Sequence, residues 1–389
     1  MAQQPHSLYL HIPFCTTKCT YCAFNTYINL ETLIPAFVDA LCAELRTVAR
    51  SQLRTPLWSI FFGGGTPSLL TIPQFTQIFA TIRENFDVSP DAEITIEANP
   101  NDLSYEYLVG LRGVGVNRLS LGMQSAVESE LKLFARRHDH TVVKAIWPDI
   151  RRAGFDNVSI DLIYGTPYQT LESWRATLGA TLALAPEHIS LYALGLEDGT
   201  PLKDWVEQGR VAAPDDDLAA DMYELATDLL DEHGFHQYEI SNWSKPGRES
   251  RHNLQYWRNW PYIGVGPGAH GFAGGVRYAT ILAPQRYIAA MQSGADTDYP
   301  FPRTPATVDE VEVDPDAEIA ETLIMSLRLI EEGISLANFE SRFGRPLHAI
   351  HGDTITKYTG YGLLEESNGR LHLTRRGRLL SNMIFRELV

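Results

Sequence analysis

Short runs of apolar and β-branched residues alternate with helical hydrophobic patterns from residue 7 to about residue 196. This alternation is typical of βαβ units, in which helices connect the strands of a parallel sheet. Because each strand candidate is almost continuously apolar, we expect both faces of the sheet to be covered. Six units are fewer than the eight of a closed barrel, so the pattern predicts an α/β fold with an open, partial (βα)6 barrel. The strand candidates are residues 7–12, 57–64, 92–99, 118–125, 157–165 and 188–196.

The alternation ends after residue 196. Residues 197–300 contain an acidic helical pattern near 215–233, one strand-like segment at 238–243, and loops rich in glycine and tryptophan. Residues 303–318 are acidic and contain prolines, which is typical of a boundary between domains. We therefore expect a core domain at 1–300 with an extension at about 197–300, an acidic linker at 301–318, and a C-terminal domain at 319–389.

The C-terminal part combines helical patterns with a hairpin signal. The helical patterns cover residues 318–330, 335–343 and 347–364. The hairpin signal is the Asn368-Gly369 pair, which lies between two strand-like segments. Helices followed by a hairpin predict a small α+β domain that is similar to a winged helix.

The composition limits the partners. The chain has 389 residues and a formal net charge of -16. Nucleic acid and anionic lipid are held by basic fields, so we expect neither as a partner. No apolar run approaches the length of a membrane span, and the N-terminal residues lack the pattern of a secretory signal peptide. The sequence therefore predicts a cytoplasmic protein whose partners are small molecules or other proteins.

Three of the four cysteines, Cys15, Cys19 and Cys22, lie close together in the chain. Thiolate binds both zinc and iron-sulfur clusters, so the spacing has two chemical interpretations. A structural zinc site needs four ligands, and neither His6 nor His11 has the spacing of a zinc finger. A cubane cluster ordinarily takes four cysteines, one for each iron. Three cysteines leave one iron open to an outside ligand, such as the amino and carboxylate groups of S-adenosylmethionine.

The flanks of these cysteines and a downstream glycine motif resemble a known family. The pattern Y-x-H-I-P-F-C-x3-C-x-Y-C-x-F and the GGGTPS of residues 63–68 resemble radical S-adenosylmethionine proteins of the group that contains oxygen-independent coproporphyrinogen III oxidase and the HemW-type heme chaperones. The resemblance implies a [4Fe-4S] cluster on the three cysteines and a partial barrel of the radical S-adenosylmethionine type. It also implies which residues bind S-adenosylmethionine: Tyr9, Tyr21, Gly64, Gly65, Thr66, Glu97, Gln124, Arg136 and Asp161.

The residues themselves indicate the same location. Glu97, Gln124 and Asp161 lie near the ends of three successive strand candidates, where the ligand sites of α/β folds collect. The glycines of residues 63–65 allow a ligand to approach the backbone closely. Since this motif lacks the lysine of a phosphate-binding loop, a nucleoside triphosphate is disfavoured.

Members of this family have two different kinds of function. The resemblance implies that the oxidase has a further cysteine two residues after the third, where this chain has Phe24. It also implies that a longer segment precedes the cysteine motif in the oxidase. HNLQYW, residues 252–257, matches the H-N-x-x-Y-W motif of HemW-type proteins, and His270 in GVGPGAHGF is a second candidate for a heme contact. Imidazole is a common axial ligand of heme iron, and aromatic side chains pack against flat apolar groups. The heme contacts that the resemblance implies are His252, Asn253, Tyr256 and Trp257.

We therefore expect a heme chaperone that binds heme and transfers it to recipient hemoproteins such as respiratory cytochromes. The alternative is the oxidative decarboxylation of porphyrinogen propionates by an oxygen-independent coproporphyrinogen III oxidase. The expected cofactors are a [4Fe-4S] cluster, S-adenosylmethionine and heme. The expected partners also include an electron donor for the cluster and a second copy of the chain, since an exposed heme surface favours a homodimer. The binding residues leave open whether S-adenosylmethionine is cleaved, and therefore whether the protein is an enzyme.

Overall fold

One curved sheet organises the larger part of the molecule. The computed structural model describes residues 4–50, 56–294 and 298–388. Within these residues, twelve strands form one sheet in the order β12-β11-β10-β9-β1-β2-β3-β4-β5-β6-β8-β7, and three further strands form a second sheet in the order β13-β15-β14. The strands are β1 His6–Ile12, β2 Pro56–Gly64, β3 Asp87–Ala98, β4 Arg118–Gln124, β5 Val158–Tyr164, β6 His188–Ala193, β7 His236–Glu239, β8 Asn242–Ser244, β9 Tyr262–Val265, β10 His270–Ala273, β11 Val276–Thr280, β12 Thr307–Glu312, β13 Ile334–Ser335, β14 Leu364–Ser367 and β15 Arg370–Leu373.

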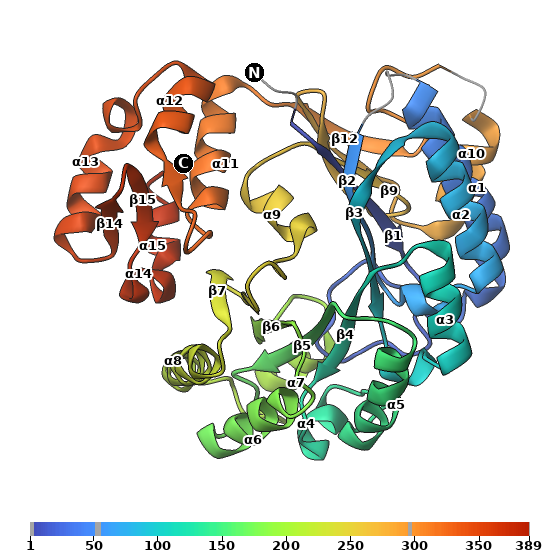
Figure 1. Ribbon diagram of the computed structural model, residues 1–389, viewed down its shortest axis with the longest axis horizontal. Coiled ribbons are helices and arrows are strands. Elements are labelled where there is room, and N and C mark those ends of the chain that lie inside the picture. Colours follow the sequence, from blue (N-terminus) through green and yellow to red (C-terminus); the bar gives the residue numbers. More distant parts are fainter. Residues whose placement is uncertain (1–3, 51–55, 295–297, 389) are drawn as a thin grey trace.

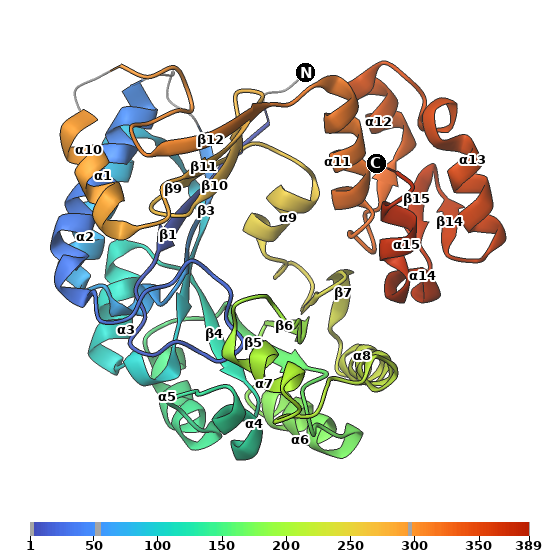
Figure 2. The ribbon, with the colours of Figure 1, turned by 180° about the vertical axis from the view of Figure 1, so that it is seen from behind.

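Helices cover the convex face of the large sheet. Figure 1 and Figure 2 show α1, α2, α3, α5 and α6 on this outer side, whereas α9 and the C-terminal helices lie on the concave side. The helices are α1 Ile34–Arg50, α2 Ile72–Asn85, α3 Tyr105–Val114, α4 Glu128–Leu133, α5 His140–Arg152, α6 Leu171–Leu182, α7 Pro201–Glu207, α8 Asp216–Glu232, α9 Arg251–Trp257, α10 Pro284–Gly294, α11 Pro315–Ser326, α12 Leu336–Phe343, α13 Leu347–Gly360, α14 Arg375–Leu379 and α15 Ser381–Phe385.

The centre of the sheet is parallel and its edges are antiparallel. Strands β1 to β6 pair in sequence order, and β9 extends the parallel set beyond β1. The six strand predictions and the open α/β architecture are confirmed. Antiparallel strands β10 to β12 extend one edge, and β8 and β7 extend the other. The prediction of one strand at residues 238–243 is wrong, because a turn at residues 240–241 separates β7 from β8.

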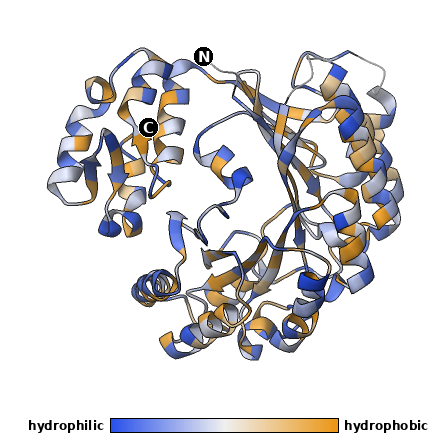
Figure 3. Ribbon diagram, viewed as in Figure 1, coloured by the Kyte–Doolittle hydropathy of each residue, from blue (hydrophilic) through white to orange (hydrophobic). Residues whose placement is uncertain are grey.

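The two faces of the parallel strands differ in polarity. Side chains that alternate along a strand point to opposite faces. Leu8 and Ile60 belong to the apolar core beneath the helices, where the hydrophobic strand residues of Figure 3 meet the hydrophobic sides of those helices. Their neighbours Ser7 and Ser59 are also fully buried, and their hydroxyl oxygens lie 2.6 Å apart. The concave side of the sheet therefore carries polar groups in a buried setting.

The C-terminal helices enclose an apolar cluster of their own, which includes Leu323, Phe339 and Leu371. The hairpin prediction is confirmed, because β14 and β15 pair in antiparallel register around Asn368 and Gly369, whose φ angles are 51° and 70°. Such positive φ values are those of a tight hairpin turn.

The segment expected to be an acidic linker, residues 301–318, belongs partly to the large sheet. It contains β12, which pairs with β11, and the beginning of α11. Two residues that follow this segment form ion pairs with residues that precede it. Glu332 is paired with Arg258 at 2.8 Å, and Arg375 is paired with Asp228 at 2.7 Å. These contacts hold the C-terminal helices against the rest of the chain, and the domain boundaries themselves stay a prediction.

Candidate functional site

A cavity of about 670 Å³ lies at the carboxyl ends of strands β2 to β6. Its volume is in the range of small-molecule sites, and its position is the one where α/β folds place their ligands. We call it the cysteine cavity. Of the residues that the sequence predicted for the cluster and S-adenosylmethionine, the following line it: Cys15, Cys19, Cys22, Tyr21, Gly64, Gly65, Thr66, Glu97, Gln124, Arg136 and Asp161.

The loop that carries the cysteines is anchored on both sides. The Cys15 amide donates to the Tyr27 carbonyl oxygen at 2.9 Å. The Thr20 hydroxyl donates to the Leu133 carbonyl oxygen at 2.7 Å, and the Tyr21 ring packs edge-on against Phe134 with 4.9 Å between ring centroids. The loop is therefore fixed by backbone pairing with Tyr27 on one side and by contacts with the end of α4 on the other.

The three thiols share one electrostatic environment. The Thr66 hydroxyl donates to Cys15 Sγ at 3.4 Å, and Arg136 Nη1 donates to Cys19 Sγ at 3.5 Å. The pKa of the Cys15 thiol is raised to about 11, mainly by burial and to a smaller extent by the neighbouring thiols of Cys22 and Cys19, against the lowering effect of the Thr66 hydrogen bond. In the part of the chain that the structure describes, no three His, Cys, Asp or Glu side chains are arranged for a single metal ion. A cubane cluster is a different case, because each thiolate binds a different iron, and the donor set suits such a cluster.

Arg136 has a hydrogen-bonding nitrogen to spare. Its Nη2 donates to the Gly122 carbonyl oxygen at 2.7 Å, and its Nη1 donates to Cys19. Its Nε is buried and has no partner among the described residues. A buried N–H without a partner is rare, and a guanidinium nitrogen pairs well with a carboxylate. Arg136 therefore suits a ligand that brings a carboxylate or the anionic charge of a cluster into the cavity.

Two carboxyl groups face the cavity from strands β3 and β5, which lie on either side of β4. Glu97 Oε2 accepts a hydrogen bond from the Gly64 amide at 3.1 Å, and both Asp161 oxygens accept from the Ser120 hydroxyl, at 3.1 and 2.9 Å. Burial raises the pKa of Glu97 to about 8, and the negative charge of Asp161 adds to the shift. A cationic or hydrogen-bond-donating ligand, such as an amino group or ribose hydroxyls, suits such acceptors.

Backbone conformation shapes the wall of the cavity. Gly64 has a φ of 106°, and a Cβ on Gly65 would lie 2.7 Å from the Phe14 carbonyl oxygen. Gln124 has a φ of 66°, which is uncommon for a residue with a side chain, and it follows a register irregularity between β4 and β5. The glycines therefore admit close approach of the cysteine loop, and the strained residue lies where a ligand site is expected.

A second cavity, of about 550 Å³, adjoins the first. We call it the aromatic cavity. Phe24, Gly64 and Glu97 line both cavities and thus form a shared wall. Tyr9 lies on the aromatic cavity and not on the cysteine cavity. Its role toward S-adenosylmethionine stays a prediction, as do the roles of the other residues expected to bind that ligand. The aromatic cavity is lined by Tyr9, His11, Phe24, Asn25, Gly64, Glu97, Tyr256, Trp257, Asn259, Tyr262, Gly268, His270, Arg277, Leu282 and Met325.

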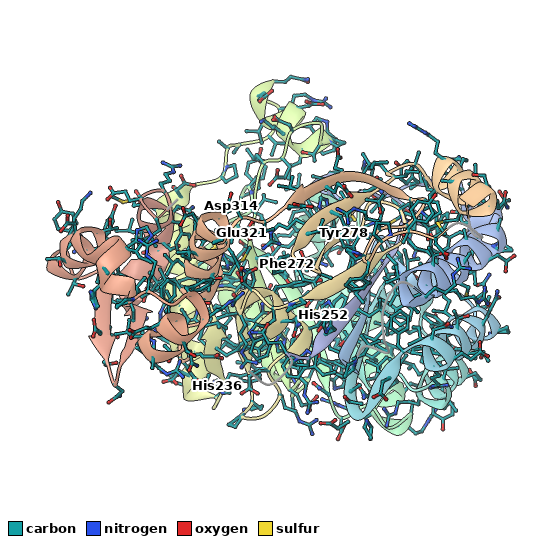
Figure 4. All side chains as sticks on the ribbon, turned by 90° about the horizontal axis from the view of Figure 1, so that it is seen from above. His236, His252, Phe272, Tyr278, Asp314 and Glu321 are labelled. Carbon is teal, nitrogen blue, oxygen red and sulfur yellow. The ribbon has the colours of Figure 1, made fainter. Side chains whose placement is uncertain are left out.

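The HNLQYW motif forms most of helix α9, where the sequence indicated a loop. Tyr256 and Trp257 line the aromatic cavity, whereas His252 and Asn253 line neither cavity. His252 is only 1% exposed, its Nδ1 lies 2.9 Å from the Ser59 hydroxyl and its Nε2 lies 2.9 Å from the Tyr256 hydroxyl. Burial lowers the pKa of His252 to about 3, and the charge of Arg118 adds to the shift. The imidazole of His252 is therefore neutral, and both of its nitrogens are hydrogen-bonded. Figure 4 labels its position between the sheet and the C-terminal helices.

Comparison with known proteins agrees with this geometry. Residues 9–180 match the radical SAM superfamily, and residues 313–380 match the HemN C-terminal domain. The chain is 35% identical to the heme chaperone HemW of Lactococcus lactis, with 100% of this chain and 98% of the relative covered, and 36% identical to that of Bacillus subtilis, with 97% and 98% covered. The chain belongs to the HemW family. A HemW of Mycobacterium tuberculosis is 37% identical, with 100% of this chain and 96% of the relative covered.

The fold of this HemW-family chain is also found in a solved enzyme structure. The coproporphyrinogen III oxidase HemN from Escherichia coli superimposes with a TM-score of 0.85 over 99% of this chain and 90% of its own, at 24% sequence identity. This likeness confirms the partial-barrel fold and the C-terminal unit. At so low an identity it concerns the architecture alone.

Sequence reasoning missed one part of the HemW-family site, the connection between the two cavities. His11 was considered only as a zinc ligand, and Asn25 was not singled out. In the structure the His11 Nε2 donates to the Asn25 carbonyl oxygen at 3.0 Å, so its Nδ1 accepts from the Tyr9 hydroxyl, also at 3.0 Å. The position of Asn25 directly after the cysteine motif was the available signal, but its partners are distant in the sequence.

Proposed function

We propose that the protein is a heme chaperone, which binds heme and transfers it to recipient hemoproteins. Its similarity to proteins named heme chaperone HemW over essentially the whole chain carries this proposal. The aromatic cavity supports it, because aromatic and apolar side chains can pack against a flat macrocycle. The candidate heme contacts from the motif are Tyr256 and Trp257, which reach this cavity, and His252 and Asn253, which do not reach it in this conformation.

The cysteine cavity would hold the other cofactors. Cys15, Cys19 and Cys22 would bind three irons of a [4Fe-4S] cluster and leave the fourth iron for S-adenosylmethionine. Such a cluster, once reduced, supplies the electron that splits S-adenosylmethionine. The residues that we propose to hold S-adenosylmethionine are Tyr9, Tyr21, Gly64, Gly65, Thr66, Glu97, Gln124, Arg136 and Asp161. In this arrangement Arg136 supplies donors, and Glu97 and Asp161 supply acceptors.

The oxidase alternative is less well supported. The chain has Phe24 where the oxidase motif continues to a further cysteine. Phe24 is 69% exposed and belongs to the wall between the two cavities. The likeness to coproporphyrinogen III oxidase is a likeness of fold, whereas the similarity to HemW chaperones extends over the full sequence at a higher identity.

One experiment separates the two functions. Anaerobically reconstituted protein is incubated with heme or with coproporphyrinogen III, in the presence of S-adenosylmethionine and a reductant. We expect stoichiometric heme binding, transfer of that heme to an apo-hemoprotein such as apomyoglobin, and no decarboxylation of coproporphyrinogen III. Formation of protoporphyrinogen without heme binding would contradict the chaperone function and support the oxidase function.

The finer parts of the proposal concern partners and place. Respiratory cytochromes as recipients, a separate electron donor, a homodimer and a cytoplasmic location stay predictions. In the residues that the structure describes, no helix combines the length and the apolar character of a membrane span.

A further inference from the structure

The aromatic cavity presents one free imidazole. His270 begins β10, is exposed and lines the cavity, and its imidazole has no hydrogen-bond partner among the described residues. His11 also lines the cavity, but it is 5% exposed and both of its ring nitrogens are engaged, by Tyr9 and by the Asn25 carbonyl. Iron in heme takes an imidazole nitrogen that carries no other partner on that side. His270 meets this condition in the conformation that the structure shows.

The imidazole of the HNLQYW motif does not meet it. Both ring nitrogens of His252 are hydrogen-bonded, and its ring stacks on Phe61 with 5.0 Å between centroids. Helix α9 is also tied down at its start, because Glu93 accepts hydrogen bonds from the Arg251 amide at 3.0 Å and the His252 amide at 3.2 Å. To bind iron, His252 would have to leave these partners and α9 would have to move.

The turn that carries His270 is built for a close approach to β9 and to the cysteine loop. A Cβ on Gly264 would overlap with the carbonyl oxygen of His270, and a Cβ on Gly268 would overlap with the Asn25 side chain. The Gly266 amide donates to the buried carboxylate of Glu44 at 2.7 Å. The glycines of GVGPGAHG therefore fix the position of His270 beside the cavity.

The remaining walls suit a flat apolar ligand. The rings of Tyr256 and Tyr262 meet edge to face with 4.6 Å between centroids, and Trp257 completes an aromatic side. On the wall formed by β11, Arg277 lies over Phe272 at 4.3 Å and is paired with Glu321, so this wall is linked to α11. Figure 4 labels Phe272 and Glu321, the two residues that Arg277 contacts. Phe24 and Leu282, which are 69% and 58% exposed, lie on the lining as well.

We propose that heme binds in the aromatic cavity with His270 as the axial ligand of its iron, and that His252 is a positioning residue which holds Tyr256 against that cavity. This inference rests on the proposed function and assigns its heme site. The shared wall of Phe24, Gly64 and Glu97 then lies between heme and the cysteine cavity.

The test compares two histidine variants of the full-length protein with two probes. Ferric heme reports axial ligation through its absorption and resonance Raman spectra, and metal-free protoporphyrin IX reports occupancy of the cavity through quenching of tryptophan fluorescence. For His270→Ala we expect heme affinity at least about tenfold lower, because one coordinate bond is lost. Protoporphyrin affinity should change by less than about twofold, since the aromatic walls remain. Free imidazole should restore the wild-type heme spectrum.

His252→Gln supplies the contrast, because glutamine keeps hydrogen-bonding capacity toward Ser59 and Tyr256. We expect this variant to keep the wild-type axial-ligand signature. A wild-type spectrum in His270→Ala, or loss of the imidazole signature in His252→Gln alone, overturns the assignment while heme binding by the wild type still supports the chaperone. Failure of the wild type to bind heme at all overturns the proposed function itself.

Discussion

The Asn25 side chain donates a hydrogen bond of 2.9 Å to the carbonyl oxygen of Pro267. A second bond from the same nitrogen, of 3.0 Å, reaches the Leu282 carbonyl oxygen. One amide thus joins the loop that carries the cysteines to the turn that carries His270. The two cavities are therefore linked by these hydrogen bonds as well as by the residues that line both of them.

Asn25→Ala should weaken both sites. It removes two hydrogen bonds, each with a net contribution of about 0.5–1.5 kcal/mol, and leaves two backbone oxygens without this donor. We expect lower iron content after anaerobic reconstitution and heme affinity roughly three- to tenfold lower. Iron analysis and heme titration measure the two effects. Asn382→Ala, an exposed position on α15, is the control and should change neither. Loss at one site alone would show that the connection is not functional.

Gly268→Ala should cost more stability than the same change at Gly209. Both glycines have positive φ, 85° and 67°, so an alanine pays a backbone cost of about 1–2 kcal/mol at either position. A Cβ at Gly209 meets nothing within 4 Å, whereas one at Gly268 would overlap with Asn25. Denaturant unfolding should show an additional loss of at least about 1 kcal/mol for Gly268→Ala. Equal losses would mean that the turn adjusts freely.

Glu97→Gln should change how stability depends on pH. The pKa of Glu97 in the folded protein is about 8, above its ordinary value of 4.5. The folded state therefore holds this proton more strongly than the unfolded state, so the contribution of Glu97 to stability is full below the ordinary pKa and is lost as pH rises through about 8. Glutamine does not ionise and avoids this loss.

The measurement is urea unfolding of both proteins without added cofactors, at about pH 5 and about pH 9. The free energy of unfolding of Glu97→Gln relative to wild type should be higher at the alkaline pH than at the acidic pH. A difference that does not depend on pH would contradict the raised pKa. Binding of S-adenosylmethionine, measured separately, should weaken in the variant because the amide is a poorer acceptor for an amino group.

Replacement of Cys15, Cys19 and Cys22 by alanine should abolish the iron-sulfur absorption of anaerobically reconstituted protein, because the donor set for the irons is lost. Cys42→Ala is the matched control, since Cys42 is buried in α1 within the apolar core and away from the cavity. If the iron-sulfur absorption survives the triple replacement, the assignment of the cluster to these three cysteines is wrong.

Glu44→Ala should destabilise the fold near the His270 turn. The buried carboxylate accepts hydrogen bonds from the Gly266 amide at 2.7 Å, the Tyr287 hydroxyl at 2.7 Å and the Thr304 hydroxyl at 2.9 Å. Alanine leaves these buried donors unpaired, and we expect a loss of about 2–4 kcal/mol in the free energy of unfolding. Glu340→Ala, an exposed position on α12, should stay within about 0.5 kcal/mol of wild type. A comparable loss for both would show that the burial of Glu44 is not the cause.

The amino-acid sequence by itself determined what depends on neighbours along the chain. The alternation of apolar runs and helical patterns predicted six parallel strands, and the Asn368-Gly369 pair predicted a hairpin. The spacing of the three cysteines indicated a metal or cluster site, and the resemblance to a family implied the cluster. Strand ends also located Glu97, Gln124 and Asp161 on one cavity, because parallel strands end on the same edge of a sheet.

Only the tertiary structure decided what depends on groups that are far apart in sequence. The strand-like segment at 238–243 divides into β7 and β8, and the acidic segment 301–318 supplies β12, because pairing with distant strands overrides local composition. The motif indicated His252 for heme, yet packing of α9 against the sheet buries this imidazole and leaves His270 exposed on the cavity. The exposure of a side chain depends on all the groups that pack around it, so exposure cannot be predicted from the type of residue and its spacing in a motif.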